Sequence, residues 1–139
     1  ERLAKAKRGY AMEYARSIMQ EAVGLLGEEE GGGLLAHAAR LVGMQHVHAV
    51  AAMLGVTTLP DFLLTMARAE GDAEASLAPQ PDGSVILTRQ SLPLFRGIDA
   101  TPAMLTAWQA LMRGAVAAWD RFARLEALGP MAWRISADR

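Results

Sequence analysis

The clearest pattern of hydrophobic and polar positions lies between residues 101 and 128, where bulky apolar side chains recur every three or four positions. Thr101 is a good N-cap, and Pro102 suits the first helical turn because its φ is already fixed and its missing N–H would have no partner there. Gly129-Pro130 follows as a typical helix end. We therefore predict one long helix over 101–128. Its bulky stripe consists of Met104, Trp108, Leu111, Ala115, Trp119 and Phe122.

A second stripe on the same predicted helix consists only of small residues. Gly114 lies within it, although a glycine inside a helix costs about 1 kcal/mol relative to alanine. This cost favours a close backbone contact at Gly114, while a general alanine bias without any contact is the simpler alternative. If the contact exists, the partner is a neighbouring helix, a second subunit or a ligand. The stripe consists of Ala103, Ala107, Ala110, Gly114, Ala117 and Ala118.

Helical spacing also dominates the first half of the chain, which we predict to form three helices over about 3–26, 34–54 and 59–70. Thr57 or Thr58 can cap the third helix. The segment 27–33, with three glutamates and three consecutive glycines, is predicted to be a flexible linker. The expected buried sides are Tyr10, Tyr14, Ile18, Ala22 and Leu25, widened by Met12, Met19, Val23 and Leu26, in the first helix; Leu35, Ala38, Leu41, Val42, Ala49 and Met53 in the second; and Leu59, Phe62, Leu63, Met66 and Ala67 in the third.

The pattern changes after Gly71-Asp72. Residues 74–78 and 84–90 flank a Pro-Asp-Gly sequence, which is turn chemistry, so we predict a β-hairpin. Residues 131–136 alternate like a further strand. The predicted fold class is α+β: about three N-terminal helices, a β-hairpin, a long amphipathic helix and a final strand, with three strands in one antiparallel sheet. We expect a single domain over 1–139, with a helical part at about 3–70 and a hairpin, helix and strand part at about 73–137.

Composition and charge argue against several classes of function. A formal net charge of −1 and a pI near 6.3 speak against a nucleic-acid binder, which needs a concentrated basic face. The chain has no cysteine, and therefore no disulfide, thiol nucleophile or cysteine-based metal site. It has no run of about 18 uncharged apolar residues and no signal-peptide pattern, so we expect no membrane contact and a cytoplasmic location. A segment upstream of Glu1 could still carry function.

The three histidines, His37, His46 and His48, all lie in the second predicted helix. A helical metal pair needs ligands at i and i+4, and no two of these histidines have that spacing. We therefore expect no metal, and nothing in the sequence indicates a cofactor. A histidine that opens into a pocket could act as an acid or base, which makes His46 and His48 catalytic candidates. The commoner role of such histidines is structural, with the ring hydrogen-bonded.

The order of elements in the second half of the chain resembles a known family. Residues 85–93 form a strand that runs into an apolar loop, the long helix carries Trp108 and Trp119, and Trp133-Arg134-Ile135 lies in the last strand. This arrangement is similar to the L-2-amino-thiazoline-4-carboxylic acid hydrolase-like proteins and to the related small-molecule-binding domains of the 4-vinyl reductase type. The resemblance implies a fold that holds a small, partly apolar ligand between helices and sheet.

The chain also departs from that family. Members commonly carry Cys-Pro at the end of the strand, where this chain has Leu92-Pro93, and further cysteines in the helix, where this chain has none. No cysteine- or metal-based role therefore carries over from the resemblance.

The first functional hypothesis is a small-molecule-binding domain, either a sensor or an accessory protein. We expect its pocket between the second helix, the loop 92–98 and the long helix, with walls that include Phe95 and Trp108. Arg89, Arg96 or Arg134 could clamp a carboxylate on the ligand with two parallel hydrogen bonds. Arginines are more often ordinary surface residues, which is the competing interpretation of all three.

Two other functions stay open, so the sequence does not decide whether the protein is an enzyme. One is a hydrolase-like enzyme with His46 or His48 as general base, although analogy of fold is a weak warrant for chemistry. The other is an interaction module in which the helix face with Ala107 and Gly114 forms a homodimer seam, because two-fold dimers are the commonest oligomers.

Overall fold

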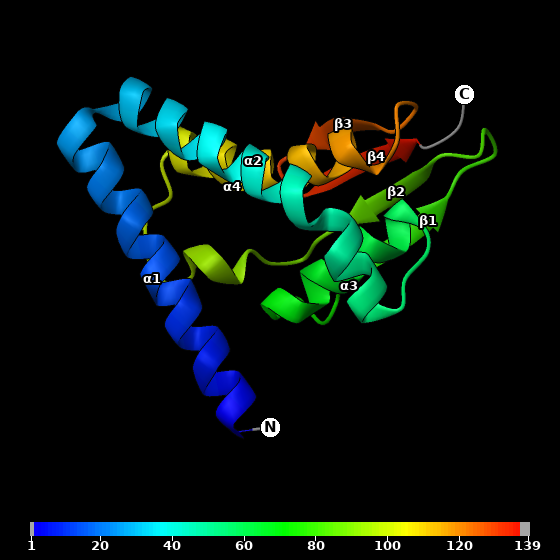
Figure 1. Cartoon of the computed structure of the whole chain (residues 1–139), viewed down its shortest axis with the longest axis horizontal. Helices are drawn as coiled ribbons and strands as arrows, with labels where there is room; N and C mark the ends of the chain where they lie inside the picture. The colour runs from blue at the N-terminus through cyan, green and yellow to red at the C-terminus, as the bar shows by residue number, and fades with distance from the viewer. Residues whose placement is uncertain (1, 137–139) are drawn as a thin grey trace.

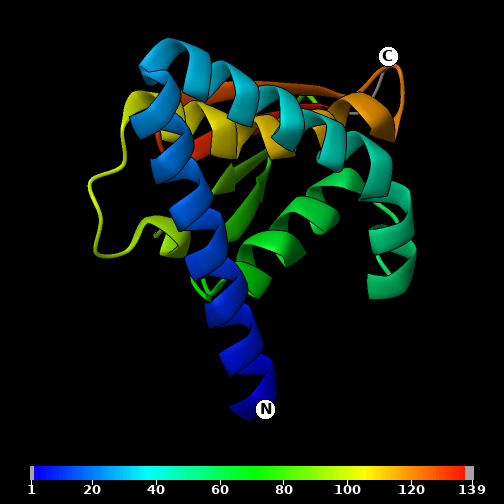
Figure 2. The ribbon, with the colours of Figure 1, turned by 60° about the vertical axis from the view of Figure 1, so that its left-hand side comes forward.

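The computed structural model describes residues 2–136, apart from the side chains of Ala4, Lys5 and Arg8. Within these residues the fold is α+β, as predicted, with four α-helices and a four-stranded antiparallel sheet in the order β1-β2-β4-β3. Helices α2 and α4 lie side by side, α4 contacts the sheet, and the N-terminal half of α1 extends away from the rest (Figure 1, Figure 2). The elements are α1 Arg2–Leu26, α2 Glu28–Leu54, α3 Leu59–Glu70, β1 Ser76–Pro79, β2 Val85–Thr88, a 3-10 turn η1 Pro93–Phe95, α4 Pro102–Trp119, β3 Arg124–Gly129 and β4 Ala132–Ser136.

The prediction of three strands is wrong, because residues 124–129 form β3 rather than the last turns of the long helix. Helix α4 ends at Trp119, where the Asp120 carboxylate accepts hydrogen bonds from the amides of Phe122 and Ala123, at 2.7 and 2.8 Å. β3 then pairs with β4 in antiparallel register. The helix propensity of the segment is small compared with pairing along a whole strand, so tertiary contacts override it.

The predicted hairpin and final strand are confirmed. β1 and β2 pair around the turn at Pro81-Asp82-Gly83, and β2 pairs with β4. The Ser84 hydroxyl and amide both donate to Asp82 Oδ1, at 2.6 and 2.9 Å, and these hydrogen bonds lower the pKa of that carboxyl below its ordinary value. Leu87, Trp133 and Ile135 form the buried face of the sheet and are at most 1% exposed.

The glycine-rich segment 27–33 is not the flexible linker that we predicted. Gly27, with a φ of 90°, is the single non-helical residue between α1 and α2, and α2 begins at the next residue. Gly31 and Gly32 are buried inside α2. A Cβ at Gly31 would overlap the backbone of α1, and a Cβ at Gly32 would lie 2.7 Å from Ala103 Cβ of α4. These glycines permit close contact between helices.

The small face of α4 packs against α2 of the same chain. Ala107 is fully buried, and a Cβ at Gly114 would fall on the Arg40 carbonyl oxygen of α2. Gly43 makes the reciprocal contact, since a Cβ there would fall on the Leu111 carbonyl oxygen of α4. We call this contact the α2–α4 seam. The close contact expected at Gly114 therefore exists, but it is intramolecular, and the face that carries Ala107 and Gly114 is covered rather than free for a homodimer.

The buried side of α2 differs from the predicted one for the same reason. Val47 and Ala51 are buried together with the glycines, whereas Leu41, Val42 and Met53 are exposed. Small residues make the contact with α4, so the positions of the large side chains did not indicate the buried face.

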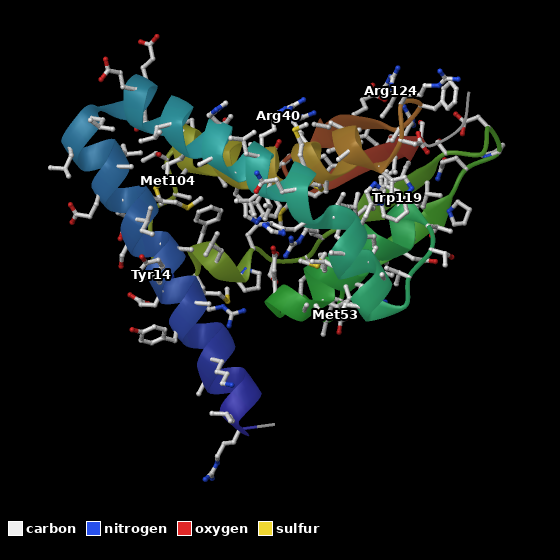
Figure 3. The ribbon with its side chains drawn as sticks, in the orientation of Figure 1. Tyr14, Arg40, Met53, Met104, Trp119 and Arg124 are labelled. Atoms are coloured by element: carbon white, nitrogen blue, oxygen red, sulfur yellow. The ribbon has the colours of Figure 1, made fainter. Side chains whose placement is uncertain are left out.

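Helix α1 carries apolar side chains on two faces. Met19 and Val23 lie half-buried against the core, as part of the wider stripe that we expected. Met12 and Ala22 are also half-buried, whereas the other members of the predicted stripe are exposed. Tyr14 points away from the body of the protein (Figure 3). Both stripes fit the helical period, so only packing decides which one is covered. The exposed α1 stripe consists of Tyr10, Tyr14, Ile18 and Leu25.

Helix α3 forms as predicted. The Thr58 hydroxyl accepts a hydrogen bond from the Asp61 amide at 3.3 Å, and the buried residues include Phe62, Leu63 and Ala67. No single helix among residues 2–136 is both long and apolar enough to cross a membrane. Helices α2 and α3 reach that composition only as a pair, with a bend of 86° between them.

Candidate functional site

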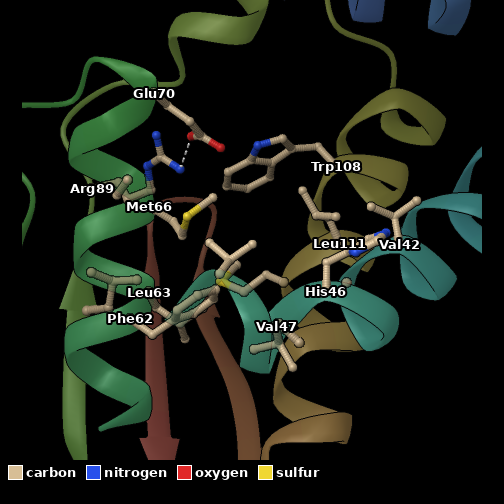
Figure 4. Close-up of a pocket in the computed structure, with 16 residues that line it drawn as sticks. Val42, His46, Val47, Phe62, Leu63, Met66, Glu70, Arg89, Trp108 and Leu111 are labelled. Carbon is tan, nitrogen blue, oxygen red and sulfur yellow. Dashed lines mark ion pairs between the residues drawn. The ribbon is translucent and has the colours of Figure 1, made fainter. Parts of the chain in front are cut away.

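A cavity of about 220 Å³ lies in the angle between α2 and α3 and is bounded on another side by α4 (Figure 4). Its walls are apolar except at His46, Glu70 and Arg89. The apolar lining consists of Val42, Gly43, Val47 and Val50 of α2, Phe62, Leu63, Met66 and Ala67 of α3, Leu87 of β2, and Trp108, Leu111, Met112 and Ala115 of α4.

The ends of two elements bring charged residues to one end of this cavity. Glu70 is the last residue of α3, Gly71 ends the helix with a φ of 115°, and Asp72 follows directly. Arg89 follows directly after β2, and its amide donates to the Met131 carbonyl at 2.8 Å, which holds it in the sheet. The end of α3 therefore supplies two carboxylates, and the end of β2 supplies the guanidinium cation.

Both acids hold Arg89, whose side chain is only 5% exposed. Its Nη1 lies 2.6 Å from Glu70 Oε2, and its Nε lies 3.5 Å from Asp72 Oδ2. Asp72 Oδ2 also accepts the Gln90 amide at 3.0 Å. The guanidinium carbon is 5.1 Å from the centre of the Trp108 ring, which is within cation–π range. Both contacts of Arg89 with the acids are ion pairs without hydrogen-bond geometry, because Glu70 Oε2 and Arg89 Nε, like Arg89 Nη2, are buried and have no hydrogen-bond partner among residues 2–136.

The charged group at this end of the cavity is formally net negative, with Glu70 and Arg89 in the lining and Asp72, paired with Arg89, outside it. Two carboxylates face one guanidinium, and the C-terminal end of α3 adds the partial negative charge of the helix dipole. One Glu70 oxygen faces Arg89, and the other faces the Trp108 side of the cavity (Figure 4). The charge of Arg89 is therefore compensated by two carboxylates, while its Nη2 has no hydrogen-bond partner among the described residues.

A second hollow, of about 280 Å³, lies between α1, α3 and η1. Glu70 and Met66 line both spaces, and Leu94 lines only the second. Glu70 thus lies in the wall between the two spaces, but neither Arg89 nor Trp108 lines the second hollow.

Two of the four residues predicted to bind a ligand line the cavity, namely Arg89 and Trp108. Phe95 instead lies buried in the hydrophobic core. Arg96 is exposed, and its carbonyl oxygen accepts a hydrogen bond from Arg16 Nη1 at 3.0 Å. The loop that contains Phe95 and Arg96 was expected to form a wall of the pocket, and α3 forms that wall instead.

The two candidate histidines have different surroundings. His46 lines the cavity, whereas His48 does not. His48 Nε2 donates to the Ala118 carbonyl at 2.7 Å, and its ring stacks on Trp119 at a centroid distance of 5.7 Å. His48 thus ties α2 to the end of α4. Within the described part of the chain, no group of three His, Cys, Asp or Glu side chains could hold a metal ion.

Glu70 and Asp72 were not among the predicted site residues. The available signal was an acid on each side of Gly71, at the end of a predicted helix. That signal alone does not indicate a site, because only the return of the chain along β2 brings Arg89 to the two acids.

Comparisons of the chain with models of protein families, with curated proteins and with solved structures found no match in any of the three. The resemblance to hydrolase-like and 4-vinyl reductase type proteins therefore stays an interpretation of the sequence. The cavity and its polar end are the basis for a functional proposal.

Proposed function

We propose that this chain is a small-molecule-binding domain, as a sensor or an accessory protein, and that the cavity between α2, α3 and α4 holds a partly apolar ligand. The observation that carries the proposal is an apolar cavity of about 220 Å³ with a single charged end. Protein cores are close-packed and have few voids larger than a water molecule. A cavity with apolar walls and a few polar groups is the usual form of an organic ligand site.

The volume limits the size of the ligand. An engineered apolar cavity of about 150 Å³ in another protein binds benzene, and pockets for drug-sized ligands span about 300–1,000 Å³. A cavity of about 220 Å³ therefore suits a single substituted ring or a branched chain of similar size. The resemblance to small-molecule-binding domains of the 4-vinyl reductase type agrees with this class of ligand.

Filling the cavity tests the proposal. Val50 lies in the wall and is only half-buried, so a phenylalanine there can extend into the open space. We expect toluene and benzyl alcohol to raise the melting temperature of the wild-type protein but not of Val50→Phe. A ligand at a hundred times its Kd stabilises by about 2.7 kcal/mol, which a thermal shift detects easily.

Met53→Phe is the matched control, because it adds the same ring to the same helix at a position that is 80% exposed. It should keep the response to ligand. Equal shifts in the wild-type and Val50→Phe proteins would place binding elsewhere, and no shift across a broad panel of small ring compounds would remove the proposal.

A hydrolase-like enzyme is the second candidate, and one observation favours it: His46 is in the cavity wall. A base in that position could reach a bound molecule. Glu70, the carboxylate of the lining, comes from α3 on the opposite wall and is paired with Arg89 (Figure 4).

Self-association is a further candidate, favoured by the exposed α1 stripe. Large exposed apolar residues that gather along one side of a helix are typical of protein contacts. Sedimentation velocity over a range of micromolar concentrations tests it, and a monomer at every concentration would remove it.

A further inference from the structure

The charged end of the cavity indicates a chemical class of ligand, an inference that rests on the proposed function. We propose that the ligand carries a protonated amine, that Glu70 pairs with this ammonium group, and that the apolar body of the ligand occupies the space between α2, α3 and α4.

The charge balance favours a cation over an anion. Arg89 already faces two acids, at 2.6 Å from Glu70 and 3.5 Å from Asp72. A carboxylate on the ligand would add a third negative charge beside them, and charges removed from water are costly unless they are paired. An ammonium group instead compensates the excess negative charge.

The geometry of Glu70 leaves an oxygen for this pairing. Its Oε2 faces Arg89, and its other oxygen is directed to the Trp108 side of the cavity (Figure 4). An ionised carboxylate has about four lone-pair sites, so Glu70 can keep its ion pair with Arg89 on one oxygen and accept from an amine on the other. Glu70 would then bridge the protein's cation and the ligand's cation.

The surroundings strengthen such a pair. The Glu70 side chain is 26% exposed, and the apolar walls beside it keep the local dielectric below that of water. Hydrogen bonds between charged groups are shorter and stronger than neutral ones. Arg89 holds Glu70 in place, so little conformational freedom is lost when the ligand binds.

Arg89 Nη2 supports a competing ligand, because this buried donor has no hydrogen-bond partner among the described residues. A neutral molecule with an acceptor oxygen could satisfy it. The charge balance favours the amine, and a neutral alcohol of the same shape separates the two possibilities.

Four probes of one size make the test: benzylamine, benzyl alcohol, benzoate and toluene, titrated by calorimetry near pH 7, where aliphatic amines are protonated. We expect benzylamine to bind about tenfold more tightly than benzyl alcohol, because charge-assisted hydrogen bonds are roughly twice as strong as neutral ones. Benzoate should bind most weakly.

Glu70→Gln removes the charge and keeps the shape of the side chain. In this variant the preference for benzylamine should disappear, benzoate should bind more tightly, and the affinity for toluene should stay within about twofold, since its contacts are apolar. Glu74→Gln is the matched control, because Glu74 is exposed and lies outside the cavity lining. It should keep the wild-type order of affinities.

The outcomes separate this inference from the proposed function. If benzyl alcohol or toluene binds as tightly as benzylamine, the cavity binds ligands but Glu70 does not select an amine. If benzoate binds most tightly, Arg89 recognises an anion and the inference is overturned. If none of the four binds to the wild-type protein, both the inference and the proposed function fail. The wild-type series decides the question even if Glu70→Gln does not fold.

Discussion

Helices α2 and α4 meet in two different ways along their length. At the α2–α4 seam, Gly43 and Gly114 have no side chains, so the backbones of the two helices are in contact. Beside the seam, the same helices present Val47, Trp108 and Leu111 to a cavity of about 220 Å³ that α3 bounds on another side. One pair of helices therefore forms both the closest contact and an open space.

The difference shows how a small protein can keep a cavity. Backbone contact at the seam sets the spacing of α2 and α4, so these helices cannot move closer together to fill the space next to α3. Gly43 belongs to both regions, because it admits the backbone of α4 and also lines the cavity. We infer that changes at the seam affect folding, while changes around the cavity affect binding.

The largest effect is expected at the seam. Gly114→Leu places a side chain where the Arg40 carbonyl lies, and a helix backbone cannot move away cheaply. We expect a loss of more than about 4 kcal/mol, a large part of the stability of a domain of this size. Circular dichroism and urea denaturation measure it.

Gly33→Leu is the control for this prediction, because Gly33 is exposed on α2 and a Cβ there meets nothing within 4 Å. It should change stability by no more than about 1 kcal/mol, as leucine is a better helix former than glycine. Similar losses in the two variants would show that glycine matters for helix conformation rather than for contact at the seam.

An intermediate effect is expected at the charged end of the cavity. Arg89→Met leaves Asp72, which is 2% exposed, without its cation, and breaking a buried ion pair from one side costs about 3–5 kcal/mol. Arg134→Met is the control, since Arg134 pairs with Glu126 at 2.8 Å on the surface, where such a pair contributes less than about 1 kcal/mol. Chemical denaturation measures the loss of stability in both variants. Equal losses would contradict the assignment of Arg89 to a buried ion pair.

The smallest effect is expected at His46, which is exposed and belongs to the cavity wall. His46→Ala should change stability by no more than about 0.5 kcal/mol, the usual range for surface substitutions. Ligand affinity in the calorimetric series should stay within a few-fold of the wild-type value. Gln45→Ala, at the neighbouring exposed position outside the lining, is the control. A large and specific loss of a catalysed hydrolysis in His46→Ala would favour the enzyme alternative.

Local signals predicted much of the fold. Thr58 and Thr101 cap helices that begin where expected, and the turn at Pro81-Asp82-Gly83 joins the expected strands. The errors occur where a residue acts through a distant partner. The local pattern places Gly31 in a linker, because the sequence does not show the α1 backbone that lies beside it.

The candidate site was predictable only in part. Arg89 and Trp108 stood out as a cation and a large aromatic residue, and both line the cavity. Glu70 and Asp72 did not, because a carboxylate at a helix end is common, and only the buried Arg89 guanidinium beside it indicates a site. The cavity itself depends on the angle between α2 and α3, which no local pattern specifies.

The helical periods, the caps, the hairpin turn and the α+β class can be predicted from the sequence, because each depends on residues within a few positions of one another. Packing in three dimensions determines which of two apolar stripes of α1 is covered, that residues 124–129 form a strand, and that Gly114 meets α2 of its own chain. It also brought Arg89 between Glu70 and Asp72 at the end of a cavity. The physical reason is that burial, pairing and charge compensation depend on distances in space, and chain segments far apart in sequence set those distances.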